Sequence, residues 1–390
     1  MSNATKPKVL FPFTEAGMGH IMPMRAIADE FERLYGDKVE IVRSQFFTEG
    51  GKKELAEFEQ VMAKQVRGYN AHPAFGWFAT LNMEFFGARL SSLGTMKLLM
   101  PKAYKEGVEH VDELAPDLVV STHWATNYYA KHSKTQPLTA MFCPDVQINP
   151  LFRYDCDLTM VAMKTGYEHA LKRHKRRFNE NNLKLVDFCI RKEAYEIPTD
   201  KREVRRKLGI KEDGFVVVLA EGGYGIGKME AICESLIARD LPITLVPVCG
   251  KNEELYEKFK DMKTGEKIDF RPQGFCKNIL EYIAASDIFL GKSGNIIAEP
   301  TFFGVPSIIT NHSTNIEKFI ADYYTKEVGC AIDVLDAEKA ADKVEEFFRN
   351  PELLQPYIAA AKAVHNRYGA RKACEEIYKL LLTRFPGLNE

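Results

Sequence analysis

Short apolar runs alternate with amphipathic helical patterns along most of the chain. The runs at Val9–Phe13 and Leu118–Ser121 are rich in branched and aromatic side chains, which favours strands. Between these runs, apolar positions recur at helical spacing. Ile27 and Phe31 fall on one face of a helix that we expect Pro23 to open. Alternation of this kind is typical of parallel βαβ units.

The same alternation stops in a basic, helical stretch at 165–182 and begins again at Phe215. A less regular region rich in aromatic residues and methionine lies at about 48–100. The other predicted strands are Val39–Val42, Leu138–Phe142, Leu158–Val161, Phe215–Ala220, Ile243–Val248, Asp269–Arg271, Ile288–Gly291 and Ser307–Thr310. The sequence therefore predicts an α/β protein with two Rossmann-like domains, each an open parallel sheet, facing a cleft.

Length and local composition suggest where these domains end. A chain of 390 residues exceeds one ordinary core, which favours two domains of roughly 170 residues. The stretch 191–200 contains Pro198 and is a plausible hinge. We therefore expect an N-terminal domain at 1–190 and a second domain at 191–365. The helix at 366–390 is expected to pack back on the first domain.

Charge and cysteine content exclude several classes of protein. The formal net charge is -1, so nothing indicates general binding to nucleic acid. The eight cysteines form no Cys-x-x-Cys pair and no metal-spaced cluster, which favours reduced thiols and no bound metal. We find neither a signal-peptide pattern nor a membrane span. The expected location is the cytoplasm, with any membrane contact peripheral.

The segment from Gly291 to Thr310 predicts a strand, a turn of small residues, a helix and a second strand. Backbone N–H groups at such a turn, with the positive end of a helix dipole, favour an anion. Ser293, Gly294 and Asn295 are small enough to admit a diphosphate to the backbone. Glu299 would accept hydrogen bonds from ribose hydroxyls. This combination is the chemistry of holding a nucleotide-sugar.

A second glycine-rich loop, EGGYGIGK at 221–228, follows an apolar strand. Gly222 and Gly223 would let a phosphate approach the backbone, although the glycines also fit a simple tight turn. The loop has the spacing of a P-loop, but Met229 stands where a magnesium-binding Ser or Thr is required. An NTPase is therefore disfavoured.

The loop EAGMGH at 15–20 occupies the corresponding place in the first half. His20 would lie where the positive end of a helix favours the neutral imidazole, which can accept a proton from an attacking hydroxyl. The alternative is a capping or core histidine. Asp145 and His123 also follow predicted strands, so each could orient His20, touch the acceptor or cap a helix.

Two features are compatible with a membrane surface. The basic segment 172–177 could meet anionic headgroups, although such a segment is usually a solvated helix face. An apolar partner would come from aromatic residues that could equally be core: Phe75, Trp77, Phe78, Phe85 and Phe86.

Together these segments resemble the UDP-sugar glycosyltransferases of the GT-B fold. The resemblance is strongest to monogalactosyldiacylglycerol synthases, processive diacylglycerol glucosyltransferases and the peptidoglycan N-acetylglucosaminyltransferase. It rests on LAEGGYGIGKMEAICESL, LVPVCGKNEEL and QGFCKNILEYIAASDIFLGKSGNIIAEPTFFGVPSII, which follow one another in the second half. In the first half it rests on GMGHIMPMRAIADEF, PDLVVSTH and FCPDV.

The resemblance implies roles for individual residues. Phe275 marks the backbone that contacts uracil, Glu299 the ribose ligand and Glu317 an acidic residue near the sugar. Gly222, Gly223, Ser293, Gly294 and Asn295 would surround the diphosphate, while Gly17, Gly19 and His123 would lie on the acceptor side. His20 matches the histidine that ends the N-terminal glycine loop. The chain departs from the pattern at Glu15 and Ala16, where glycine is usual, and at Ile316, where glutamine is frequent.

The resemblance implies an inverting enzyme that transfers a hexose from a UDP-sugar to a hydroxyl of a lipid or glycolipid such as diacylglycerol. The domain at 1–190 would bind the acceptor and the domain at 191–365 the UDP-sugar donor. No metal or other cofactor is expected. His20, with Asp145, would remove the acceptor proton while the glycine turns stabilise the departing UDP. The rivals are a transferase with a small soluble acceptor, a UDP-sugar epimerase and a non-catalytic nucleotide-sugar sensor.

Overall fold

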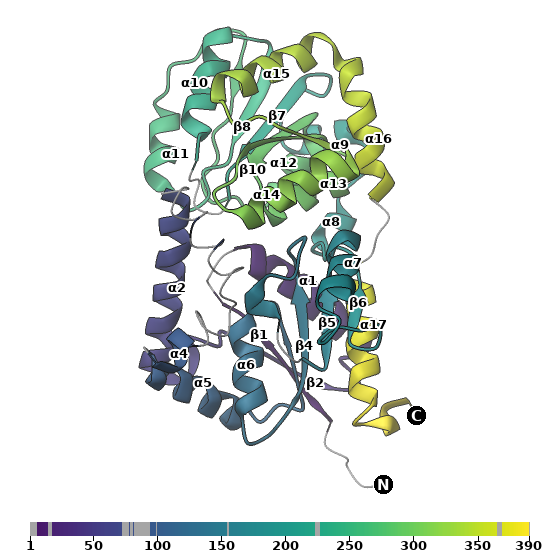
Figure 1. Cartoon of the computed structure of the whole chain (residues 1–390). Coiled ribbons are helices and arrows are strands. Elements are labelled where there is room, and N and C mark those ends of the chain that lie inside the picture. The colour runs from purple at the N-terminus through teal and green to yellow at the C-terminus, as the bar shows by residue number, and fades with distance from the viewer. Residues whose placement is uncertain are drawn as a thin grey trace. The chain divides into compact units, whose positions relative to one another are not determined.

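The described part of the chain divides into two units. A computed structural model describes residues 6–14, 18–71, 78, 81, 94–98, 100–153, 156–222, 227–364 and 369–389 (Figure 1). Unit 1 comprises the described residues within 1–69, 74–192 and 368–390, and unit 2 those within 70–73 and 193–367. The end of the chain therefore returns to the unit in which the chain begins.

Unit 1 is built on a parallel sheet with the strand order β2-β1-β3-β4-β5-β6. Its strands are β1 (Lys8–Pro12), β2 (Glu40–Ser44), β3 (Leu118–Ser121), β4 (Leu138–Cys143), β5 (Leu158–Val161) and β6 (Leu183–Leu185). Residues of β3 and β5 are buried throughout, because helices cover both faces of the sheet. This burial explains why these strands appear in the sequence as mostly apolar runs, with no regular alternation of apolar and polar residues.

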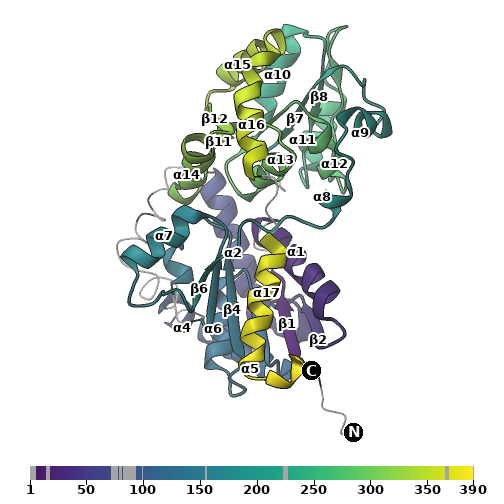
Figure 2. The same cartoon turned by 90° about the vertical axis from the view of Figure 1, so that its right-hand side faces the viewer.

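Helices cover the two faces of this sheet as the alternation of its side chains requires. On β1, Phe11 packs against Phe31 of α1, while its neighbour Leu10 joins the cluster on the opposite face. Figure 2 shows α17 beside α1, and the rings of Tyr35 and Tyr378 stack between them. The unit 1 helices are α1 (Met18–Tyr35), α2 (Lys53–Ala71), α4 (Gly94–Leu98), α5 (Pro101–Leu114), α6 (Trp124–His132), α7 (Lys164–Arg173) and α17 (Gly369–Leu382).

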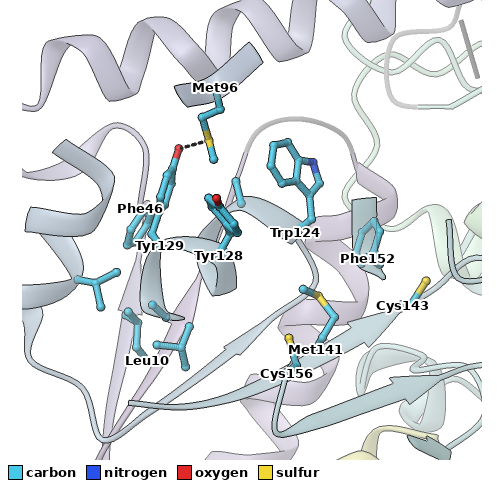
Figure 3. Packing of buried hydrophobic residues seen from close by; sticks show 14 of the residues in the cluster. Leu10, Phe46, Met96, Trp124, Tyr128, Tyr129, Met141, Cys143, Phe152 and Cys156 are labelled. Atoms are coloured by element: carbon cyan, nitrogen blue, oxygen red, sulfur yellow. Dashed lines mark hydrogen bonds between the residues drawn. The ribbon is translucent and has the colours of Figure 1, made fainter. Parts of the chain in front are cut away.

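The core on the second face joins segments distant in sequence (Figure 3). Leu10 of β1 and Met141 of β4 lie in the same cluster as Tyr129 of α6. The Tyr129 hydroxyl donates to Met96 Sδ over 3.2 Å, which ties α4 to this core. Burial raises the pKa of Tyr129 well above its ordinary value, so the hydroxyl keeps its proton.

Unit 2 repeats this architecture with the strand order β12-β11-β10-β7-β8-β9. Its strands are β7 (Phe215–Ala220), β8 (Ile243–Pro247), β9 (Asp269–Phe270), β10 (Ile288–Lys292), β11 (Ser307–Asn311) and β12 (Ala331–Asp333). All of its strand pairs are parallel. The carboxyl ends of β7, β10 and β11 therefore meet at one edge of the sheet, where the predicted glycine turns begin.

On one face of the unit 2 sheet, α10 and α15 pack over the core that contains Val217 and Leu219. The other helix contacts include α9 with α12 and α13 with α16. The unit 2 helices are α8 (Glu193–Glu196), α9 (Lys201–Lys207), α10 (Met229–Arg239), α11 (Glu253–Lys260), α12 (Ile279–Ala285), α13 (Ala298–Phe302), α14 (Asn315–Asp322), α15 (Ala337–Arg349) and α16 (Gln355–Val364). Among the described residues, no helix combines the length and the apolar character needed to cross a bilayer.

Three expectations about local structure were wrong. Pro23 does not open α1, which begins at Met18. It lies inside the helix, where it has no N–H to donate to Gly19 O. The region 48–100 contains the long helix α2. The edge strands β6 and β12 were missed because each has three residues, too few to show a periodic pattern.

Candidate functional site

His20 lies in the first turn of α1, directly beyond the loop at 15–17, which falls outside the described residues together with Gly17. Its Nδ1 lies 2.8 Å from the carbonyl oxygen of Thr122, at the end of β3. A carbonyl oxygen only accepts, so Nδ1 carries the hydrogen. The Thr122 hydroxyl donates in turn to His20 O over 2.9 Å. In the neutral ring, Nε2 is therefore the nitrogen able to accept a proton.

Aromatic rings surround His20. The ring of Phe152 is parallel to the imidazole at 6.3 Å, and the ring of His123 is perpendicular to it at 5.9 Å. His123 is buried and caps α6, where its Nδ1 accepts from Ala125 N over 3.3 Å. The rings of Phe152 and His123 thus hold the His20 ring from two sides. His123 is a helix cap that also contacts His20.

Asp145 lies after β4 and accepts a hydrogen bond from Asn149 Nδ2 over 2.9 Å. Asn149 Oδ1 accepts from Leu151 N, which begins the short turn that carries Phe152. The carboxylate is therefore linked through Asn149 to the ring that lies against His20. Asp145 is half-buried. Gly19 lies in the first turn of α1 together with His20.

Burial of His123 has a consequence for stability. Burial, with a smaller contribution from His20, lowers the pKa of His123 from 6.5 to about 3. The unfolded chain binds a proton below pH 6.5 while the folded chain does not, so stability falls as the pH drops from 6.5 towards 3. We expect His123→Asn, which retains a capping side chain, to reduce the dependence of the unfolding free energy on pH by about 1.4 kcal/mol per pH unit.

Urea unfolding at pH 4.5, 5.5 and 6.5, followed by tryptophan fluorescence, measures this slope. Trp124 directly follows His123 and reports on the same region. The surface variant Lys134→Gln controls for changes in charge elsewhere. Equal slopes in wild type and His123→Asn would show that His123 does not remain neutral in the fold.

The turn at 293–295 follows β10, as predicted, and leads into α13. Ser293 is buried and uses both of its polar hydrogens inside the protein: the N–H donates to Asn311 O over 2.7 Å and the hydroxyl to Glu317 O over 2.6 Å. No atom lies within 4 Å of the place where a Cβ of Gly294 would be. Ser293 thus fixes the turn. The Cβ position of Gly294 is open, and Asn295 begins the short 3₁₀ turn that leads into α13.

Glu317 is held in place by a network of its own. Its Oε1 lies 2.7 Å from Lys292 Nζ, and its Oε2 accepts from Ser313 N over 2.5 Å. Thr314 caps α14 by accepting from the N–H of Glu317. Lys292 ends β10 directly before the glycine turn, so this ion pair joins the strand end to the start of α14. The carboxylate balances the charge of Lys292 at the sheet edge.

The loop at 221–228 is described only at its ends, and Gly223 lies outside the described residues. Gly222 has φ of 82° and open space at its Cβ position, so this backbone conformation favours glycine. Lys228 Nζ donates to Leu335 O. That contact holds the Lys228 side chain at the loop after β12. The lysine of a P-loop would instead reach a phosphate.

The remaining predicted donor residues lie at separate points of unit 2. Glu299 is half-buried in the first turn of α13, beside the glycine turn. Phe275 lies between β9 and α12 with 57% of its surface exposed. The chain leading to it is fixed by Gln273, whose N–H donates to Pro247 O over 2.8 Å. No group of three metal-ligating side chains occurs among the described residues.

The chain is similar to known glycosyltransferases along most of its length, although no protein-family model matches it. It is 25% identical to the processive diacylglycerol β-glucosyltransferase of Bacillus subtilis, covering 96% of each protein. It is 26% identical to the peptidoglycan-precursor N-acetylglucosamine transferase of a Thermoanaerobacter strain, covering 93% of this chain and 96% of that protein. A probable monogalactosyldiacylglycerol synthase of Oryza sativa is 22% identical over 88% of this chain and 74% of its own length.

Several solved structures are similar to this chain in fold. Acinetobacter baumannii MurG matches 96% of this chain and 99% of its own with a TM-score of 0.55 at 12% identity. Anabaena HepE in complex with UDP-glucose matches 96% and 99% with a TM-score of 0.56 at 14% identity. The chain has the GT-B fold. A Listeria monocytogenes protein assigned as a UDP-N-acetylglucosamine 2-epimerase also matches, with a TM-score of 0.62, 13% identity and coverage of 99% and 98%.

The GT-B fold and the resemblance to the glycolipid glycosyltransferases agree with the sequence prediction. Sequence reasoning missed Thr122, Lys292 and Glu221, each at the end of a strand beside a predicted site residue. Lys292 directly precedes the predicted turn, and a charged residue closing an apolar strand is a usable signal. Nothing in the sequence indicates that a backbone carbonyl of Thr122 meets His20, because 102 residues separate them.

Proposed function

We propose that this protein is an inverting glycosyltransferase that moves a hexose from a UDP-sugar to a hydroxyl of a lipid or glycolipid acceptor such as diacylglycerol. His20 is the proposed general base and Asp145 a residue that supports its surroundings. Gly222, Gly223, Ser293, Gly294 and Asn295 are the proposed diphosphate residues, with Glu299 at the ribose, Phe275 at the base and Glu317 near the sugar.

The observation that carries this proposal is the orientation of His20. Its Nδ1–H is committed to Thr122 O, which leaves Nε2 as the proton acceptor. In the proposed step, Nε2 takes the hydroxyl proton while the hydroxyl oxygen bonds to C1 of the sugar. The bond from C1 to the diphosphate oxygen breaks, and UDP leaves with that electron pair. Attack opposite the leaving group converts an α-linked donor into a β-glycoside.

Support for the donor comes from unit 2 and from the comparisons. Open space at Gly222 and Gly294 allows a ligand to approach the backbone closely. The Anabaena HepE structure, which is similar in fold to this chain, contains UDP-glucose. We assign no metal to the reaction, since backbone N–H groups at the turn can stabilise the departing diphosphate.

Support for a lipid acceptor comes from the relatives, whose names specify diacylglycerol, monogalactosyldiacylglycerol and an undecaprenol derivative. In unit 1, Phe78 is 66% and Leu98 is 81% exposed, and Lys172, Arg173, Lys175 and Arg176 are exposed at the end of α7. Apolar and basic side chains of this kind suit peripheral contact with an anionic membrane. The other predicted aromatics, Phe75, Trp77, Phe85 and Phe86, lie outside the described residues.

The proposal is tested by incubating the purified chain with labelled UDP-glucose, UDP-galactose or UDP-N-acetylglucosamine and vesicles that contain diacylglycerol. We expect label from one donor to enter the lipid fraction as a β-glycoside. The anomeric proton coupling of the product identifies that configuration. Label that enters only water-soluble products would contradict the lipid acceptor, and absence of UDP binding would contradict the whole proposal.

The epimerase neighbour makes a second function worth testing in the same assay. An epimerase would convert a UDP-sugar into its epimer without vesicles or any other acceptor. Nuclear magnetic resonance of the UDP-sugar pool after incubation without acceptor distinguishes the two reactions. We expect the donor to remain unchanged under those conditions.

A further inference from the structure

Glu221 is a buried carboxylate that the mechanism above leaves without a role. It follows β7 and is 2% exposed. Its Oε1 accepts from the Thr310 hydroxyl over 2.7 Å, and its Oε2 accepts from Met229 N over 3.1 Å. Thr310 lies on β11 and Met229 is the first residue of α10. One side chain thus joins two strands that flank β10 to the start of a helix.

Gly227, near the end of the glycine loop, lies directly against this carboxylate. A Cβ placed on Gly227 would lie 1.8 Å from Glu221 Oε2. Any larger residue at this position would displace the carboxylate or the loop. Gly222, at the other end of the loop, has no atom within 4 Å of its Cβ position. The two glycines therefore serve different purposes: Gly227 accommodates Glu221, and Gly222 leaves space for a ligand.

Glu221 also changes where an anion can bind in unit 2. The N–H of Met229 at the start of α10 already donates to a carboxylate of the chain itself. A phosphate placed at that end of α10 would meet a like charge and lose that donor. The turn at 293–295 differs, because Lys292, which directly precedes it in the chain, is a cation paired with Glu317.

We propose that Glu221 is a positioning residue of the donor site, which holds Gly227 and the start of α10 in place and directs the diphosphate to the turn at Gly294. This inference rests on the proposed function, since it presumes a UDP-sugar as ligand. Burial raises the pKa of Glu221, and hydrogen bonds from Thr310 and from the backbone of Lys228 and Met229, together with Lys292, oppose that change. The negative charge of Glu317 is paired with Lys292.

Calorimetric titration of the full chain with UDP at pH 8 tests the inference in Glu221→Gln, Glu221→Ala and wild type. Glutamine can accept from Met229 N–H and donate to the Thr310 hydroxyl, so it retains both contacts without the charge. We expect it to bind UDP about fivefold more tightly, because a like charge near the diphosphate is removed. Alanine loses both contacts, and we expect UDP to bind about tenfold more weakly or worse.

Glu230→Gln is the matched control, because Glu230 also lies in the first turn of α10 but pairs with Lys258 at the surface. Its UDP affinity should equal that of wild type. Where Glu221→Ala does not fold, Thr310→Val removes one contact and should weaken UDP binding in the same direction. Equal UDP affinity in Glu221→Ala and wild type would overturn the inference. So would UDP binding by Glu221→Gln that is as weak as that of Glu221→Ala. A wild-type chain that binds no UDP would instead refute the proposed function.

Discussion

His20→Ala is expected to lower turnover by about 100-fold or more while the Kd for UDP changes by less than about twofold, since a general base contributes that much to proton transfer and none to nucleotide binding. The physical basis is the contact between His20 Nδ1 and Thr122 O, which fixes the protonated nitrogen and leaves Nε2 to accept. Initial rates with saturating donor and calorimetric titration with UDP measure the two quantities separately.

His132→Ala is the matched control. His132 belongs to the same unit, and its Nδ1 lies 2.8 Å from the carbonyl oxygen of Tyr128, so it makes the same kind of hydrogen bond away from α1. We expect this variant to retain wild-type turnover. If both variants lost turnover equally, the effect would come from packing in unit 1. Unchanged turnover in His20→Ala alone would remove His20 from the mechanism.

Glu299→Ala is expected to raise the Kd for UDP by about 10- to 100-fold, because hydrogen bonds to a charged group contribute roughly 1.5–3 kcal/mol each. The carboxylate lies in the first turn of α13, directly after the glycine turn. A ligand that lacks the ribose hydroxyls shows whether these hydroxyls are the partners of the Glu299 carboxylate. Wild type should discriminate between UDP and 2′,3′-dideoxy-UDP, and the alanine variant should bind both with similar, weak affinity.

Glu281→Ala provides the comparison for this variant. Glu281 also lies in the first turn of a short helix of unit 2, where it pairs with Lys207 at 3.4 Å. Its replacement should leave UDP affinity unchanged. Retained discrimination between UDP and the dideoxy compound in Glu299→Ala would place the ribose elsewhere.

Much of the fold was predictable from local patterns. The buried strands at 118–121, 158–161 and 215–220 were assigned with the bounds that the structure shows, because parallel strands covered on both faces are mostly apolar. The edge strands β6 and β12 escaped prediction, since a three-residue strand carries no period. Pro23 misled the assignment of α1, because proline is usual in the first turn of a helix, whereas here it lies inside the helix.

The candidate site was predictable as a set of loops, but the sequence could not assign each side chain its partner. The turn at 293–295 stood out through its small residues, and the structure shows that Ser293 turns both polar hydrogens inward. Glu317 was noted only through the resemblance, whereas its pairing with Lys292 depends on the neighbouring positions of β10 and α14. Such contacts depend on strand order, which a single sequence does not reveal.

The sequence by itself determined the alternation of strands and helices, the glycine turns that follow the strands and the resemblance to glycolipid glycosyltransferases. These are local properties, because periodic burial and small residues act within a few positions. Only the tertiary structure decided that Thr122 fixes the tautomer of His20. It also decided that the Glu221 carboxylate accepts a hydrogen bond from the first N–H of α10. The hydrogen bond from His20 to Thr122 joins residues 102 apart, and the bond from Thr310 to Glu221 connects β11 to the end of β7 across β10. Both form only because parallel strands bring their carboxyl ends to one edge of a sheet.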